Sequence, residues 1–167
     1  MKKRQLPGWI LAALCLLFAC GCSVEPQDKF FELDDKVSTA FFEYRVEDVS
    51  VHQDYCGLSA REGCRIVVVE LAIKNKENYK LPMSRYDFRL QWGLEGEDFA
   101  YSERWYYQEQ LREEYEIPEK ESVQGQLVFQ VPQEQQNLCL AYLEIFENDT
   151  QGDAYFTCFT VESAAAK

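Results

Sequence analysis

Cysteine is the residue of this chain whose chemistry depends most on the compartment that holds it. The 167 residues include seven cysteines and one histidine, His52. Four cysteines lie in the long polar part of the sequence, at separations of eight, seventy-five and nineteen residues: Cys56, Cys64, Cys139 and Cys158. No Cys-x-x-Cys pair occurs among them, so the spacing favours disulfides over a zinc site.

The pairing of these four cysteines has three possible forms. Cys56 and Cys64 bracket a seven-residue segment, which favours a local bridge, and elimination then leaves Cys139 with Cys158. Strand alternation argues against that second bridge. If Glu144 faces solvent, Cys139 faces inward, whereas the neighbours of Cys158 turn it outward. The connectivity therefore stays open at this point.

Other residues that could do chemistry form no recognisable constellation. The single histidine has no motif around it that would support a Ser-His or Cys-His nucleophile or a catalytic zinc site. Two acidic turns lack the residue order of a calcium loop: Glu95, Glu97 and Asp98, then Asn148, Asp149 and Asp153. No carboxylate pair stands out for glycoside hydrolysis. We therefore expect no metal, no cofactor and no enzymatic activity.

An aromatic stretch is the sequence feature that most suggests a binding surface. Five large rings fall within fifteen residues: Tyr101, Trp105, Tyr106, Tyr107 and Tyr115. One amphipathic face cannot bury them all, so some are expected to reach solvent and to stack on a sugar or dock a protein. The alternative, which we favour, is that the stretch folds back to cap an open end of the domain.

Most of the segments that would carry these residues are expected to be strands. Apolar residues alternate with polar ones over 37–51, 65–74, 86–92, 123–131, 138–146 and 154–161. A change of phase near Asp48 predicts a bulge. Ser102 can cap a short helix over 102–116. The pattern predicts an all-β, immunoglobulin-like two-sheet β-sandwich with one short helix or structured insert near 102–116.

The N-terminus has the features of an export signal. A basic start precedes an apolar run over residues 9–19, which is too short to span a bilayer. Leu17-Phe18-Ala19-Cys20 resembles the lipobox of bacterial lipoproteins, which implies lipid attachment at Cys20, with Cys22 after Gly21 as the alternative. We expect a signal peptide at 1–19, a lipidated cysteine and tether at 20–35, the domain at 36–162 and a disordered tail at 163–167.

The charge of the mature chain excludes one class of partner. Removing the signal peptide takes three of the 17 basic residues and none of the 29 acidic ones, which leaves a net charge of −15. Such a surface repels nucleic acid and anionic lipid head groups. It is compatible with a solvated exterior and with attraction of cations or a basic partner.

Three segments resemble a known family. A valine-rich stretch ends in Lys-Asn at 74–75, a Ser-x-x-Asp-Phe-x-Leu stretch follows at 84–90, and a Phe-x-Val-Pro ending lies at 129–132. Together they are similar to the telokin-like, immunoglobulin-like domain of unknown function in exported lipoproteins of Gram-positive bacteria. The resemblance covers about 35–161 and implies a cell-surface binding domain without catalytic residues. The cysteines and the long 99–117 stretch depart from that pattern.

These observations predict a lipid-anchored binding module on the outer face of the bacterial cytoplasmic membrane. Its partner would be a protein, a peptide or a cell-wall glycan, contacted through the aromatic stretch. Two other functions remain open, a small cell-envelope hydrolase built on the sandwich and a structural subunit of an envelope assembly.

Overall fold

The valine-rich strand β6 (Cys64–Asn75) lies at the centre of one of two sheets in the computed structural model, which describes residues 25–93, 98–146 and 149–162. It pairs antiparallel with β3 (Phe42–His52) on one side and with β11 (Ser122–Pro132) on the other. The short β2 (Val37–Ser38) completes a four-stranded sheet in the order β11-β6-β3-β2.

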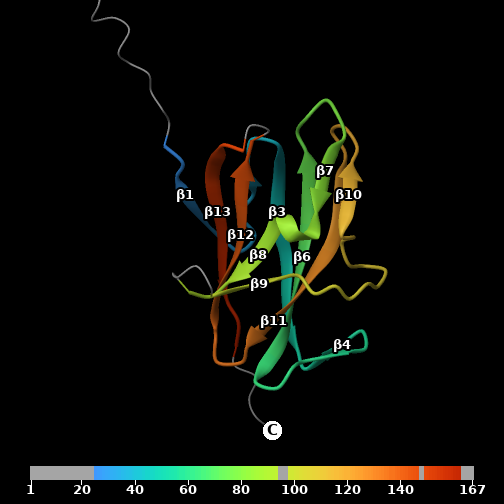
Figure 1. Cartoon of the computed structure of the whole chain (residues 1–167), viewed down its shortest axis with the longest axis vertical. Coiled ribbons are helices and arrows are strands. Elements are labelled where there is room, and N and C mark those ends of the chain that lie inside the picture. Colours follow the sequence, from blue (N-terminus) through green and yellow to red (C-terminus); the bar gives the residue numbers. More distant parts are fainter. Residues whose placement is uncertain (1–24, 94–97, 147–148, 163–167) are drawn as a thin grey trace, which may run out of the picture.

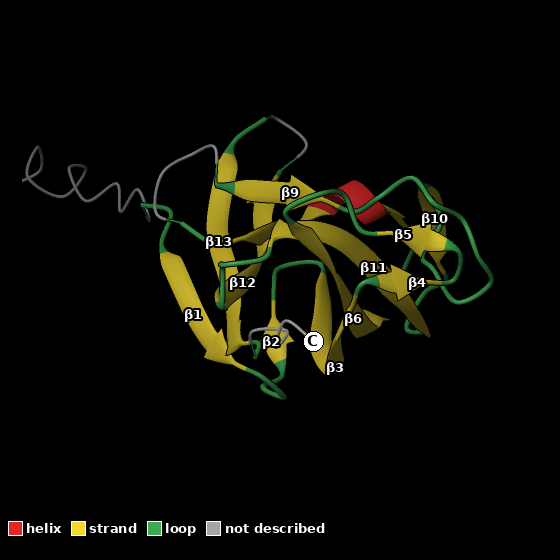
Figure 2. Cartoon of the chain, turned by 90° about the horizontal axis from the view of Figure 1, so that it is seen from below, coloured by secondary structure: helices red, strands yellow, loops and turns green. Residues whose placement is uncertain are grey.

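The second sheet has five strands in the order β1-β13-β12-β8-β9. Its members are β1 (Asp28–Glu32), β8 (Phe88–Gln91), β9 (Phe99–Tyr101), β12 (Asn137–Ile145) and β13 (Gln151–Thr160). Only the β1–β13 pair is parallel. Two further pairs extend the structure: β7 (Leu81–Ser84) with β10 (Glu114–Ile117), and β4 (Asp54–Tyr55) with β5 (Leu58–Ser59). The sheets face each other as two layers (Figures 1 and 2), so the predicted all-β sandwich is confirmed.

The core lies between the two sheets, where the predicted alternation places it. Val67, Val69, Leu71 and Ile73 of β6 are each at most 1% exposed. They belong to one apolar cluster with Phe88 and Leu90 of β8 and with Leu138 and Leu140 of β12. Burying such side chains contributes about 1.5–3 kcal/mol each. The alternation therefore provides most of the force that joins the layers.

The register shift in β3 also agrees with the sequence. The pairing of β3 with β6 slips between Val46 and Asp48. Tyr44 and Val46 are fully buried before the slip, and Val49 and Val51 pack against the same core after it. The bulge thus lets both apolar phases of one strand face inward.

The predicted short helix over 102–116 does not form. Within the described ranges the one helix is a 3-10 turn at Arg85–Asp87, while 102–111 runs irregularly along β11. Its backbone binds the edge of the sheet: the Glu103 N–H donates to the Val128 carbonyl at 2.6 Å, and the Leu111 N–H to the Gln126 carbonyl at 3.0 Å. Bonds to β11 replace the bonds of a helix, and the Ser102 hydroxyl accepts from the Val128 N–H instead of capping one.

The region predicted as a tether contains β1. Phe31 packs against the core beside Tyr155, and Phe30 stacks on Phe156 with ring centroids 5.1 Å apart. Lys29 forms an ion pair with Asp153 at 2.6 Å. Residues 28–32 are polar enough to read as a linker, but their two phenylalanines have partners on β13 that only the fold supplies.

Several sequence predictions lie outside the described residues. These are the signal peptide, both candidate lipid-bearing cysteines (Cys20 and Cys22) and the C-terminal tail at 163–167. In the described part of the chain, no helix has the length and apolar character needed to cross a membrane.

Candidate binding groove

The five aromatic residues of the predicted surface occupy different places. Tyr101 ends β9 and is 51% exposed, while Trp105 and Tyr106 are 43% and 60% exposed on the stretch beside β11. Tyr107 and Tyr115 are largely covered. The structure therefore divides the set among separate surfaces of the domain.

Tyr107 covers the outer face of the four-stranded sheet. Its hydroxyl donates to Gln126 Oε1 at 2.7 Å, and the Tyr55 hydroxyl donates to the same oxygen at 2.8 Å. The two rings meet edge to face 5.6 Å apart and pack over Ile66 and Val68. Burial, together with the neighbouring Tyr55 hydroxyl, raises the pKa of Tyr107 well above its usual value. This ring stabilises the fold and is not free to bind a partner.

The rest of the stretch covers the edge strand β11, whereas the favoured interpretation expected a cap over an open end of the domain. Leu111 is 5% exposed and lies over Gly125 of β11, where a Cβ would come within 2.6 Å of it. Trp105 lies over the turn between β4 and β5, at 3.7 Å from the Cβ position of Gly57. Exposed edge strands invite pairing with other chains, and this segment shields β11 from it.

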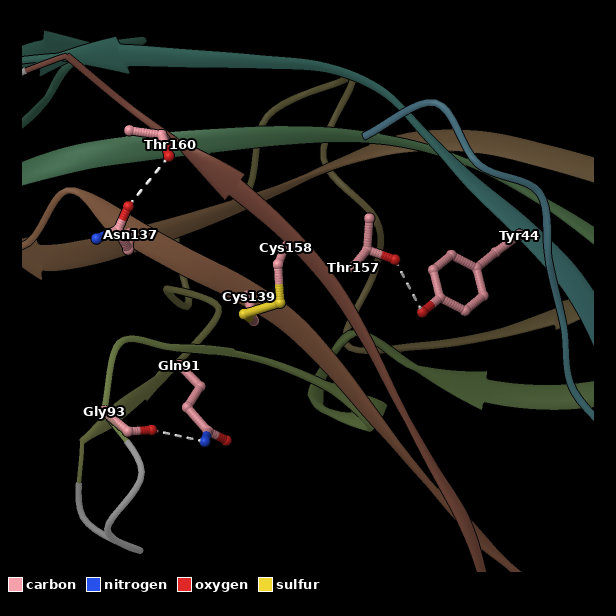
Figure 3. Close-up of a disulfide and its surroundings, with 8 residues drawn as sticks. All are labelled: Tyr44, Gln91, Gly93, Asn137, Cys139, Thr157, Cys158 and Thr160. Atoms are coloured by element: carbon pink, nitrogen blue, oxygen red, sulfur yellow. Dashed lines mark hydrogen bonds between the residues drawn. A yellow bond between two sulfur atoms is a disulfide. The ribbon is translucent and has the colours of Figure 1, made fainter. Parts of the chain in front are cut away.

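Cys139 and Cys158 are joined by a disulfide with an S–S distance of 2.06 Å. They lie directly opposite each other on β12 and β13, on the face away from the core, while Thr157 points inward to Tyr44 (Figure 3). The expected orientation of Cys139 was wrong because Glu144 is buried. Its carboxylate accepts the Ala40 N–H at 2.6 Å, so the even-numbered residues of β12 face the core.

The predicted bridge between Cys56 and Cys64 is absent, and both thiols are free. Cys56 is exposed in the turn of the β4–β5 hairpin, with a left-handed backbone at φ 48°. Cys64 begins β6 opposite Pro132. The predicted bridge assumed that 57–63 is a simple loop, whereas the rest of the β4–β5 hairpin and a second turn separate the two cysteines.

A groove of about 500 Å³ lies where the chain passes from one sheet to the other. β7 pairs with β10, and the 3-10 turn then carries the chain into β8 of the five-stranded sheet (Figure 1). The walls come from both sides of this crossing and include exposed apolar side chains: Tyr79, Tyr101, Leu143, Ile145 and Phe146. Tyr101 is therefore the one member of the predicted aromatic set that lines the groove.

The turn that forms the groove follows from two residues of the Ser-x-x-Asp segment. The Ser84 hydroxyl accepts from the Tyr86 N–H at 3.2 Å, and the Asp87 carboxylate accepts the Ser84 N–H at 2.8 Å. This reciprocal capping box starts the 3-10 turn. The next residues, Phe88 and Leu90, are fully buried. The turn thus fixes Tyr86 and Asp87 at the groove while the strand after it enters the core.

A second hollow of about 450 Å³ continues the groove across β7. The two share Pro82, Met83 and Asp87, and the second also has Glu114, Tyr115 and Glu116 in its wall. Burial, reinforced by the charge of Asp87, raises the pKa of Tyr115, whose hydroxyl is buried without a hydrogen-bond partner.

The charges around the two hollows are mostly negative. Glu116 pairs with Lys80 at 3.1 Å, and Arg89 lies over the Phe99 ring at 5.0 Å. In the part of the chain that the structure covers, neither Asp87 nor Glu114 forms an ion pair. Desolvation by the groove walls raises the pKa of Asp87, although the residue remains accessible to solvent. The groove thus combines apolar walls with one carboxylate outside any ion pair, Asp87, and with Arg89, while the second hollow adds Glu114.

The described residues contain no group of three or more His, Cys, Asp or Glu side chains that could hold a metal ion. Of the acidic turns considered above, Glu95, Glu97 and Asn148 lie outside those residues.

Residues 31–152 match the family described as a domain of unknown function, DUF4352. The chain belongs to this family. No curated protein matches it.

Solved structures show the same fold. The chain is similar to YcdA, a candidate lipoprotein of Bacillus subtilis, with 21% identity and a TM-score of 0.60 over 75% of this chain and 38% of that one. It therefore spans well under half of YcdA. An uncharacterized β-sandwich protein from Clostridium difficile matches 81% of this chain and 97% of its own, with 14% identity and a TM-score of 0.51. The YjhA protein of B. subtilis matches 67% and 81%, with 12% identity and a TM-score of 0.54.

Sequence reasoning missed the groove because it read 86–92 as a single strand with an inward aromatic face. Phe88 and Leu90 are buried as expected, but Tyr86 lines the groove. The Ser-x-x-Asp spacing at 84–87 is a capping signature, and it could have indicated a turn at this point. Nothing in the sequence could have indicated that residues 141–146 lie across from it.

Proposed function

We propose that this DUF4352 protein is a lipid-anchored, non-enzymatic binding module of the bacterial cell envelope, and that the groove is its binding surface. The lipobox-like segment ending at Cys20 supports the anchor, as does the likeness to a candidate lipoprotein. One observation carries the choice of surface: exposed apolar side chains from distant parts of the chain gather around one groove. Such patches mark binding sites on soluble domains.

The position of the groove relative to the anchor supports a role at the membrane. The Gln27 N–H donates to Asp153 at the start of β13, and Ile145 pairs with Gln151 in the same region. The chain therefore enters the domain at the end where β12 contributes to the groove. Seven residues from Cys20 to Gln27 span at most about 25 Å. A groove at this end is within reach of partners held near the bilayer.

A photo-crosslinking residue in place of Tyr101 tests this surface in intact cells. The matched control carries the same residue in place of Tyr106, which is similarly exposed but does not line the groove. We expect a discrete adduct from position 101 that is lost when Ile145→Ser is added, and none from position 106. An adduct from position 106 alone would move the binding surface to the aromatic stretch.

The anchor has its own test. Metabolic labelling with a radioactive fatty acid should mark the wild-type chain, and Cys20→Ala should abolish the label while Cys22→Ala retains it. The reverse pattern would assign the lipid to Cys22, and an unlabelled wild type would reject lipidation.

A further inference from the structure

The first strand of the domain, β1, contributes little to the core. Between Glu25 and Lys36, Phe31 alone packs against the apolar cluster, and it is only partly buried. Residues 32–36 are all exposed, and Val37 of β2 is the first residue of the described chain that is fully buried. The place of β1 in the sheet therefore depends on its pairing with the neighbouring strand.

Most of the contacts that hold β1 come from β13, on one side only. β1 is the outermost strand of its sheet, and no strand in the described ranges lies beyond it (Figure 2). Its five residues pair with β13 in parallel register, and the ion pair of Lys29 and the stack of Phe30 join the same two strands. Just before β1, the Gln27 N–H donates to Asp153 at 3.0 Å. β1 can thus leave the sheet without breaking another strand pair.

β13 has its own attachment to the sheet. On its other side it pairs with β12 over most of its length, and the Cys139–Cys158 disulfide fixes that pair covalently. Tyr155 and Thr157 point into the core, where each is at most 3% exposed. Loss of β1 therefore exposes one edge of β13 and leaves the sandwich assembled.

The turn after β1 has the properties of a hinge. The Glu32 N–H donates to the Asp35 carboxylate at 2.8 Å, and the Asp35 N–H donates to the Glu32 carbonyl at 3.3 Å. Asp34 between them has a left-handed backbone at φ 71°. Lys36 pairs with Glu43, but its side chain is 57% exposed, and such pairs contribute little. The turn is thus closed mainly by bonds of its own.

We propose that β1 is a releasable strand, which detaches from β13 while the rest of the sandwich stays folded and so lengthens the tether to the membrane. Segments with few buried apolar contacts open locally at a lower free energy than the core. Release adds residues 28–36 to the tether, a segment that spans up to about 30 Å. The lengthening rests on the proposed function, because it needs the lipid anchor, whereas the release does not.

Alternate backbone amides of β13 face β1 and β12, which gives the release an internal readout. The Cα atoms of the disulfide pair are 4.0 Å apart, the short spacing of a pair without mutual hydrogen bonds. By alternation, the N–H groups of Tyr155 and Thr157 bond to β12, and those of the intervening residues face β1. The Ala154 N–H accordingly donates to the Gln27 carbonyl at 2.9 Å.

Hydrogen exchange of the full chain in a non-ionic detergent, resolved by residue with NMR, tests the release. After correction for intrinsic rates, we expect the Ala154 and Phe156 amides to exchange at least about 100-fold faster than those of Tyr155 and Thr157. Both sets lie on one strand, so the difference reports the loss of β1 and not of β13. Equal rates at all four amides would overturn the proposal.

Phe31→Ala should increase the release, because it removes the one ring by which β1 contacts the core. We expect the Phe156 amide to exchange at least about tenfold faster while Tyr155 keeps its rate. Leu33→Ala, in the turn and outside both apolar clusters, is the matched control and should change neither. Equal acceleration at both amides would show that β1 opens only with the whole domain and would overturn the proposal. The wild-type comparison needs no variant, so it decides even if Phe31→Ala fails to fold.

The two proposals fail in different ways. Uniform exchange along β13, in a chain that still gives a groove adduct and a fatty-acid label, would reject the release and retain the proposed function. Separate exchange rates in a chain that takes no label would retain the release and overturn its role in the tether.

Discussion

The outer faces of the two sheets differ in how far other segments of the chain cover them. On the four-stranded sheet, Ile66, Val68 and Val128 point outward yet are at most 1% exposed. Side chains of the β4–β5 hairpin, which lies beside this sheet in Figure 2, and the ring of Tyr107 cover them. Among the residues that the structure describes, no such segment covers the five-stranded sheet, and Phe30, Leu143 and Ile145 are 69%, 37% and 56% exposed.

The difference shows which apolar residues are available to a partner. The aromatic stretch is the strongest binding candidate in the sequence, yet its residues Tyr107 and Leu111 pack against apolar clusters of the domain itself. The groove beside β12 lies where β7, which pairs with β10, leads into β8, which pairs with β12. The apolar side chains at this crossing are left uncovered. An exposed apolar residue suggests binding only once the chain's own covering segments have been accounted for.

The two faces are also stabilised by different means. The covered face has a second small core, whereas the open face has the disulfide between Cys139 and Cys158. A covalent link between β12 and β13 needs no covering layer. It can hold the strands together while leaving their outer surface accessible.

Introducing a charge on each face gives the largest expected contrast. Val68→Asp buries a carboxylate under Tyr107 and should lower the free energy of unfolding by about 4 kcal/mol, whereas Leu143→Asp at an exposed position should cost about 0.5 kcal/mol or less. Urea titration followed by tryptophan fluorescence measures both. Similar losses of unfolding free energy in the two variants would mean that the two outer faces are covered to the same extent.

Removing the disulfide tests the open face. Cys139→Ser with Cys158→Ser opens a loop of 19 residues and should cost about 3 kcal/mol. The matched pair Cys56→Ser with Cys64→Ser removes free thiols and should change stability by about 0.5 kcal/mol or less. Denaturant unfolding under non-reducing conditions checks both, with mass spectrometry to count thiols. A large loss from the second pair would indicate a bridge there.

Truncating the cover should have a smaller, local effect. Leu111→Ala removes the buried side chain over Gly125 and should cost about 2 kcal/mol. Hydrogen exchange should accelerate at 103–111 and at Gln126, whose N–H donates to the Glu109 carbonyl. Tyr106→Ala, on the same stretch but exposed, is the control. Unchanged exchange in the Leu111 variant would show that the backbone bonds alone hold the stretch.

The smallest effect is expected from one hydroxyl. Tyr107→Phe loses the bond to Gln126 and should cost about 1 kcal/mol, whereas Tyr101→Phe at the groove should cost nothing measurable.

Alkaline pH gives an independent readout of the same hydroxyl. Because folding raises the pKa of Tyr107 above 10.0, the unfolded chain loses this proton first, and stability falls as pH rises past 10. Tyr107→Phe should flatten that decline. An unchanged slope would show that this ring does not contribute to it.

The sequence predicted the strands and the inner face well because period-two alternation is a local property. Val67 to Ile73 and Leu127 to Val131 are buried in the predicted phase, and the bulge in β3 followed from two neighbouring apolar phases. The phase of β12 was misread because Glu144 is charged and yet buried. A buried carboxylate needs partners, and Ala40, more than a hundred residues away in sequence, supplies one.

Local sequence is enough to specify the alternation that builds a sandwich, the turn at Ser84 and Asp87, and the acidity of the domain. Long-range packing specifies which apolar residues remain exposed, which cysteines meet, and that Asp87 lies beside a groove. The reason is physical: alternation and capping depend on residues a few positions apart, whereas cover and pairing depend on segments such as 102–111 and β11 that only the folded chain brings together.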